Sequence, residues 1–138
     1  MTKAFALTVR QPWASLIIWG LKGVEIRSWS TDLRGTLVIH ASKTVDDAAM
    51  RRFHLQSLPT GSVLGAVSLV DVEALTSRRW GELAVDHLDL GSFTPGLYAW
   101  HLAEPRALDD PLPWRGERGL FELKLAEGVA ERLCLSPG

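Results

Sequence analysis

The N-terminal part of the chain shows a pattern that predicts a strand followed by a helix. Residues 5–12 (FALTVRQP) alternate apolar and polar side chains with the period of two of a half-buried strand, and the strand ends at Pro12. Proline also suits the first position of a helix, here over 12–20 (PWASLIIWG), and Gly20 suits its end. The helix carries no charge on any side, so we expect it to be buried on most sides or to cover the mouth of a cavity.

The next segment, 20–29 (GLKGVEIRSW), predicts a second strand with an unusual face. One side carries apolar or small side chains, and the other carries Glu25, Arg27 and Trp29. Neighbours on one face are about 6.5–7 Å apart, so Glu25 and Arg27 can pair, and a guanidinium can stack on Trp29. Such a row is either a surface ion pair beside a half-buried indole or part of a nucleotide pocket, and both interpretations stay open on the residues alone.

The remaining pattern predicts three or four more strands and one or two more helices. We expect strands over 36–42, 62–75, 97–104 and 120–125, helices over 44–55 and 76–85, and a proline-containing excursion over 105–119. Thr44 is the expected N-cap of the second helix. Gly65, inside the long strand, predicts a bend or a close backbone approach.

This order of elements predicts the fold class. Five or six strands with two or three helices, without βαβα alternation, favour an α+β fold. We expect a mostly antiparallel sheet curled into a small barrel that removes its edges. No repeat or linker composition interrupts residues 1–138, which predicts one domain, and residues 136–138 (SPG) read as a frayed tail.

Composition excludes several classes of protein. A hydrophobic content of 46% with 22% charged residues is typical of a folded chain, and the single Cys134 excludes a disulfide framework. The four histidines lack metal-ligand spacing, so we expect no metal and no cofactor. The longest apolar run, around WASLIIWGL, is too short to span a bilayer, and no secretory signal is present. We therefore expect a cytoplasmic protein with no membrane partner.

Charge is distributed unevenly along the chain. Residues 1–43 carry six basic and two acidic side chains, a net charge of +4, whereas residues 44–138 carry nine basic and fourteen acidic ones, a net charge of −5. A basic lobe on a protein with a net charge of −1 is a possible footprint for an anionic partner.

A block of uncommon residues at fixed spacing adds a family resemblance. The block runs from Gln11-Pro12-Trp13-Ala14-Ser15-Leu16 through Gly20, Lys22, Glu25, Arg27-Ser28-Trp29, Thr31 and Arg34-Gly35 to His40-Ala41. With TGSVLGAVSLVDV and, more loosely, PLPWRGERGLFEL, it resembles the ASCH (ASC-1 homology) domain family of the PUA-like superfamily. Within that family it is most similar to the type found in the transcription coactivator that gave the family its name.

The resemblance implies a PUA-like β-barrel with flanking helices and a cleft between the barrel and the first helix. It implies RNA or single-stranded nucleic acid as the partner, with DNA possible, held in a basic cleft that tryptophans line. The residues we expect to bind nucleic acid are Arg10, Gln11, Trp13, Lys22, Glu25, Arg27, Trp29, Arg34 and Lys43. In this interpretation an indole stacks on a base, and Glu25 accepts a hydrogen bond from an exocyclic amine. The basic side chains bind phosphate.

An enzymatic alternative uses Lys22 and Glu25. Some bacterial relatives in the family are single-strand ribonucleases or amidohydrolases acting on N4-acetylcytidine, and in the latter the corresponding stretch carries a catalytic lysine in a Lys-x-x-Thr pattern. Here the pattern is Lys22-Gly23-Val24-Glu25, with a carboxylate where the hydroxyl stands. A Lys–Glu pair can perform acid–base chemistry if burial moves its pKa values toward neutrality.

Other polar residues have more ordinary interpretations. His40 is expected to be a hydrogen-bonded structural histidine, and Asp71 and Glu73 a solvated pair at a strand end. Arg115 and Arg118 either extend a basic rim or belong to an ordinary turn that includes Glu117.

Overall fold

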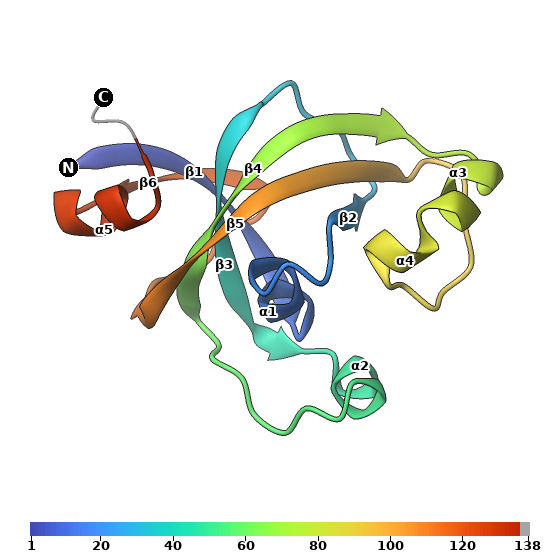
Figure 1. The fold of residues 1–138 in the computed structure, drawn as a ribbon, viewed down its shortest axis with the longest axis horizontal. Coiled ribbons are helices and arrows are strands. Elements are labelled where there is room, and N and C mark those ends of the chain that lie inside the picture. Colours follow the sequence, from blue (N-terminus) through green and yellow to red (C-terminus); the bar gives the residue numbers. More distant parts are fainter. Residues whose placement is uncertain (136–138) are drawn as a thin grey trace.

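Six strands form one mixed sheet in the order β2-β5-β4-β3-β1-β6 (Figure 1). The computed structural model describes residues 1–135. The strands are β1 (Thr2–Gln11), β2 (Val24–Arg27), β3 (Gly35–Val45), β4 (Ser62–Ala74), β5 (Tyr98–Pro113) and β6 (Leu120–Leu125). The helices are α1 (Trp13–Ile18), α2 (Asp47–Arg52), α3 (Ser77–Glu82), α4 (Ala84–His87) and α5 (Glu127–Arg132). The α+β class is confirmed, with five short helices where two or three were predicted.

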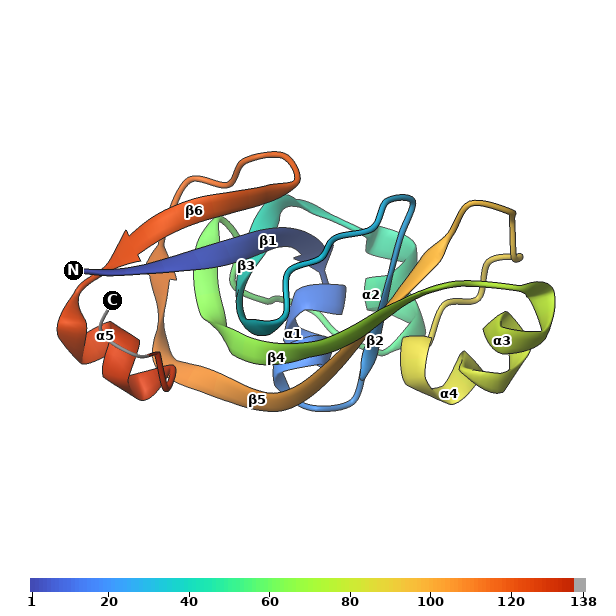
Figure 2. The same cartoon turned by 90° about the horizontal axis from the view of Figure 1, so that it is seen from above.

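The sheet is curled, and its hydrogen bonding leaves two edges. β1 and β3 run parallel, and the other neighbouring pairs are antiparallel. Figure 2 shows β4 and β5 curving away from β1 and β6, with α1 inside the curve, where it contacts β1, β3, β4 and β5 (Figure 2). β2 and β6 are the outer strands of the order. The predicted small barrel therefore takes the form of a curled, barrel-like sheet whose hydrogen bonding does not close on itself.

Both faces of the central strands are buried, which explains their β-branched composition. Leu37 and Ile39 belong to the core beneath α1, together with Ile17 and Trp100. Val38, between them, packs in a second core. The strand predicted over 36–42 is confirmed as part of β3, and each such aliphatic side chain contributes roughly 1.5–3 kcal/mol by leaving water.

The second core is closed by a helix that the sequence analysis did not predict. α5 follows β6 and contributes Ala130, and Leu133 comes just after it; both are almost fully buried beside Phe121. In Figure 1, α5 lies near the N-terminus, at the opposite end of the molecule from α3 and α4. The tail predicted over 136–138 lies outside the described residues.

β5 extends much further than predicted. It continues through Pro105, Pro111 and Pro113, in the segment expected to be an excursion, and pairs with β4 up to Ser62↔Pro113. β2 covers β5 only from Tyr98 to His101, so the prolines lie on an open edge where no ladder donor is needed. The pairing also contains three register shifts.

Gly65 permits the closest approach between β4 and β5. A Cβ atom on this residue would lie 2.2 Å from the carbonyl oxygen of Arg106. The predicted close backbone approach is confirmed, because only glycine fits there.

The start of α2 differs from the prediction. Thr44 lies in β3, which continues to Val45, and the N-cap is Asp46, whose Oδ1 accepts from the Ala49 amide at 3.1 Å. The strand continues because β1 pairs with it as far as Gln11↔Val45.

α1 ends in a way that places the following residues beneath it. Gly20 has a φ of +80°, and the amides of Leu21 and Lys22 both donate to the carbonyl of Leu16 at 3.0 Å. This left-handed stop confirms Gly20 as the helix end and turns the chain directly into β2.

Within residues 1–135, no helix has the length and apolar character needed to cross a membrane.

Candidate nucleic-acid interface

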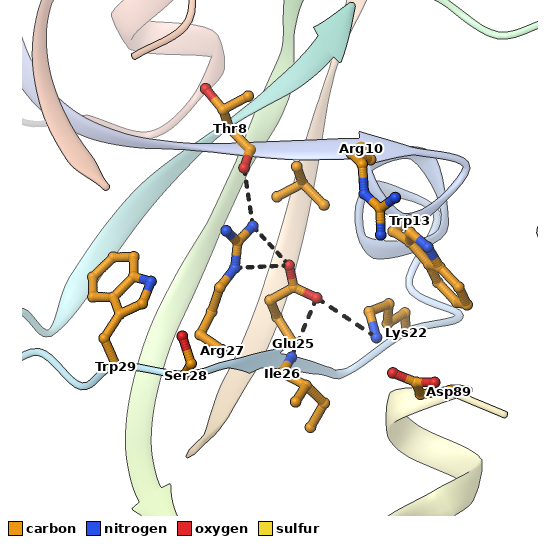
Figure 3. A pocket seen from close by; sticks show the side chains of 11 residues that line it. Thr8, Arg10, Trp13, Lys22, Glu25, Ile26, Arg27, Ser28, Trp29 and Asp89 are labelled. Carbon is orange, nitrogen blue, oxygen red and sulfur yellow. Dashed lines mark hydrogen bonds and ion pairs between the residues drawn. The ribbon is translucent and has the colours of Figure 1, made fainter. Parts of the chain in front are cut away.

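A cavity of about 350 Å³ opens between β1, β2 and the start of α1, and we call it the β1–β2 pocket. Figure 3 shows the side chains that surround it (Figure 3). β1 contributes Thr8, Val9 and Arg10, α1 contributes Trp13, and the loop after α4 contributes Asp89. The remaining lining comes from the segment predicted to be unusual, namely Lys22, Glu25, Ile26, Arg27, Ser28 and Trp29. The pocket therefore lies where β1, β2 and the start of the first helix meet.

Glu25 and Arg27 form the ion pair that their spacing predicted. Arg27 donates to Oε2 of Glu25 from Nη2 at 2.9 Å and from Nε at 3.2 Å. The same Nη2 donates to the carbonyl oxygen of Thr8 at 2.9 Å, which ties β2 to β1 across the pocket. Arg27 Nη1 has no hydrogen bond to any residue from 1 to 135, so it is available to an acceptor on a ligand.

Glu25 also neutralises a second cation. Lys22 Nζ lies 3.7 Å from Oε1, and the amide of Ile26 donates to the same oxygen at 3.3 Å. Both carboxylate oxygens are therefore engaged by protein donors. Glu25 therefore orients the two cations of the pocket.

Lys22 is buried, with 3% of its side chain exposed. Its ammonium donates to the carbonyl of His87 and lies 5.0 Å from the centre of the Trp13 ring. Desolvation lowers the pKa of Lys22 below its ordinary value of 10.5, although the nearby Glu25 and Asp89 carboxylates oppose this shift. The local sequence did not reveal this burial, because the group that covers the lysine comes from the distant segment 87–89.

The two tryptophans lie on opposite sides of the pocket, with Glu25 and Arg27 between them (Figure 3). Trp29 packs edge-on against the buried Trp100 at 4.8 Å. Trp13 donates from Nε1 to Asp46 at 3.1 Å. The predicted stacking of a guanidinium on Trp29 is not found among residues 1–135, where the cation–aromatic pairs are Lys22–Trp13 and Arg52–Phe53.

The structure brings together six of the nine residues expected to bind nucleic acid. These six, which line the pocket, are Arg10, Trp13, Lys22, Glu25, Arg27 and Trp29. Gln11 is fully buried and bonds to Ser15 and to the carbonyl of Pro59.

The other two residues are exposed and do not line this pocket. Arg34 donates to the carbonyls of Thr31 and Leu33 and lies 3.7 Å from the carboxylate of Asp71. Lys43 lies in a separate hollow. Thr8 and Asp89 are lining residues that the sequence analysis missed, and no local signal marks either of them.

The remaining polar residues have structural environments. His40 is buried, with Nδ1 3.1 Å from Thr8 Oγ1 and Nε2 2.6 Å from the carbonyl of Trp114. Glu73 is not a partner of Asp71: it accepts from Arg79 and bonds to His101, and hydrogen bonds from Arg79 lower its pKa. In the described part of the chain, no three His, Cys, Asp or Glu side chains gather in a way that would hold a metal ion.

Comparison with known proteins identifies the family. The model of the ASCH domain matches residues 7–112, which is most of the chain. The chain belongs to the ASCH domain family.

Individual relatives agree with this assignment. Activating signal cointegrator 1 from Homo sapiens and from Mus musculus are each 28% identical to this ASCH domain over 145 residues, covering 94% of it. The chain corresponds to only 24% of the length of either relative.

Solved structures agree on the fold. A crystal structure of ASCH from Zymomonas mobilis matches with a TM-score of 0.67 at 15% identity, covering 94% of this chain and 92% of that one. A mutant of the same Zymomonas mobilis protein matches equally well, over 87% and 89% of the two chains. At this identity the likeness concerns the fold alone.

Proposed function

We propose that this ASCH domain binds single-stranded nucleic acid, with RNA as the first candidate, and that the β1–β2 pocket receives one nucleotide. The observation that carries the proposal is the fixed guanidinium of Arg27, held by Glu25 and Thr8 with one nitrogen left for a ligand. A preorganised donor loses little entropy on binding an oxygen of a phosphate or a base.

The charge and shape of the pocket support the same proposal. Three cations, Arg10, Lys22 and Arg27, face two carboxylates, Glu25 and Asp89, so the lining carries a net positive charge while Lys22 is protonated. A volume of about 350 Å³ is small for an extended ligand but within the range of small-molecule sites. An aromatic side chain on each side offers a surface for a base.

Titration of a labelled ten-nucleotide RNA against the protein tests this proposal, with DNA of the same sequence in parallel. Arg10 is exposed and lines the pocket, so Arg10→Glu should weaken binding without affecting folding. The slope of log K against log salt should fall by about 0.7 if one phosphate contact is lost.

Arg34→Glu is the matched control, because Arg34 is also exposed but lies outside the pocket. It should bind RNA as the unmodified protein does. If the unmodified protein binds neither RNA nor DNA at low salt, or if the two variants behave alike, the proposed site is wrong.

A hydrolase is the second candidate, and the environment of Lys22 favours it. A buried amine with a lowered pKa, 3.7 Å from a carboxylate and beside an open cavity, is a feature of acid–base sites. In this candidate, water adds across the amide of N4-acetylcytidine and releases acetate and cytidine, or a single RNA strand is cleaved.

Incubation of the protein with N4-acetylcytidine and with labelled single-stranded RNA distinguishes the two candidates. Turnover that disappears in Lys22→Ala while RNA binding persists would establish the hydrolase. No turnover of either substrate leaves binding as the proposed function.

A further inference from the structure

A second hollow, of about 400 Å³, borders the β1–β2 pocket at Thr8. The carbonyl oxygen of Thr8 accepts from Arg27 in the first pocket, while its Oγ1 bonds to His40 in the second hollow. Figure 3 shows the Thr8 side chain pointing away from Arg27. Thr8 alone therefore separates the β1–β2 pocket from the second hollow. The distance between them is short, because neighbouring strands of a sheet are only roughly 5 Å apart.

The second hollow has a strongly cationic rim. Lys43, Arg115 and Arg118 line it, and all three are exposed. None of them forms an ion pair with any residue from 1 to 135. Glu117 is the one acidic residue in the lining, so the hollow carries more positive charge than the β1–β2 pocket.

The floor of the hollow is rigid, which gives the rim a defined position. Since the carbonyl of Trp114 can only accept, His40 Nε2 carries the proton, and a neutral His40 then accepts from Thr8 Oγ1 at Nδ1. Gly116 packs so closely that a Cβ atom there would lie 2.7 Å from both the His40 ring and Thr8 Oγ1. The Trp114 amide also donates to the carbonyl of Gly61 at 3.1 Å. The turn bearing Arg115 and Arg118 is thus fixed against β1 and β3.

We infer that a single strand with one nucleotide in the β1–β2 pocket continues past Thr8 into this hollow, where Lys43, Arg115 and Arg118 bind its backbone phosphates. The inference rests on the proposed nucleic-acid binding and adds the path of the strand. Free cations on a fixed turn suit phosphate, because they need no rearrangement and give up no internal ion pair. Trp114, which is half-buried and also lines the hollow, offers an aromatic contact for a base.

The test compares a ten-nucleotide RNA with a nucleoside 5′-monophosphate as ligands for the triple variant Lys43→Glu, Arg115→Glu, Arg118→Glu. The mononucleotide fills only the β1–β2 pocket, so its affinity should stay within twofold of that of the unmodified protein. The ten-nucleotide RNA should bind more weakly, and its salt slope should fall by about 2, which is the value for three lost phosphate contacts on a single strand.

A second triple variant, Arg78→Glu, Lys124→Glu, Arg132→Glu, is the matched control. It makes the same change in net charge at exposed positions that line neither the β1–β2 pocket nor the second hollow. Its salt slope for RNA binding should therefore equal that of the unmodified protein. Circular dichroism checks that both variants fold.

Three results would overturn the inference while leaving the β1–β2 pocket in place. They are an unchanged slope in the first triple variant, an equal loss in the control variant, and a ten-nucleotide RNA that binds the unmodified protein no better than the mononucleotide. If the unmodified protein binds neither ligand, the proposed function fails as well, and the two failures are thereby distinguished.

Discussion

The carboxylate of Glu25 lies 2.9 Å from Arg27 Nη2, and its other oxygen lies 3.7 Å from the ammonium of Lys22. One acid therefore neutralises two cations at a site where 9% of its side chain is exposed. Removing it leaves two positive charges facing each other in a poorly solvated place, whereas removing either cation leaves the acid still paired.

This arrangement predicts a large loss of stability for Glu25→Gln. The change keeps the shape of the side chain but removes the carboxylate that lies 3.7 Å from buried Lys22 and leaves it only the Asp89 carboxylate, which should lower the free energy of unfolding by about 3 kcal/mol. Urea denaturation followed by tryptophan fluorescence measures the difference. Lys22→Met should cost less, because Arg27 still neutralises Glu25.

Glu122→Gln is the control for that measurement. Its carboxylate lies 3.8 Å from Lys3, and both side chains are about half exposed or more. A surface pair of this kind contributes under about 1 kcal/mol. Equal losses in the Glu25 and Glu122 variants would mean that burial does not strengthen the Glu25 cluster.

The lowered pKa of Lys22 predicts a specific dependence of stability on pH. Because the folded-state pKa lies below the unfolded value near 10.5, the unfolded chain binds more protons between these two values. The free energy of unfolding should therefore rise with pH across that window, as the cost of burying the ammonium disappears.

The stability difference between the unmodified protein and Lys22→Met isolates this effect from other titrating groups. It should stay constant below the folded pKa of Lys22 and then shift in favour of the unmodified protein as pH rises toward 10.5. A difference that is flat with pH, or that shifts the opposite way, would show that the folded state does not lower the pKa.

The sequence predicted the pocket in part because half of it comes from one short segment. Lys22 to Trp29 is a local stretch, so its alternation alone placed Glu25 and Arg27 on one face and close enough to pair. Thr8 and Asp89 could not be found this way. They reach the pocket only because β1 lies across from β2 and because segment 87–89 folds back over Lys22.

Tertiary packing also explains positions that the sequence did not predict. Lys43 belongs to β3, which pairs with β1 and is separated from β2 by β4 and β5 in the order of the sheet, so charge along the chain did not predict its position. The prolines of β5 read as loop signals, yet they occupy an edge that no strand covers beyond His101. A single sequence does not show which edge is open.

The cap of α2 shows how one such error can be tested. Thr44 has the residue type of an N-cap, but the structure gives that position to Asp46, which accepts from the Ala49 amide and, through Oδ2, from Trp13 Nε1. Asp46→Ala should therefore lower the free energy of unfolding by about 1 kcal/mol, whereas Thr44→Ala should leave it within about 0.5 kcal/mol. Urea denaturation of both variants decides between the two positions.

The charge of Asp46 adds a second readout. The hydrogen bond from the Ala49 amide lowers the pKa of this carboxyl below 3.8, so its stabilising contribution is complete above that value and disappears as pH falls through the folded pKa. Asp46→Asn keeps a capping oxygen and should be nearly as stable near pH 7, but it should lose less stability in acid. Trp13 Nε1 donates to the other oxygen of Asp46, and an asparagine that caps Ala49 has no second oxygen to replace it, so Asp46→Ala and Asp46→Asn should both weaken mononucleotide binding. If Thr44→Ala proves the more damaging change, the helix begins where the sequence alone placed it.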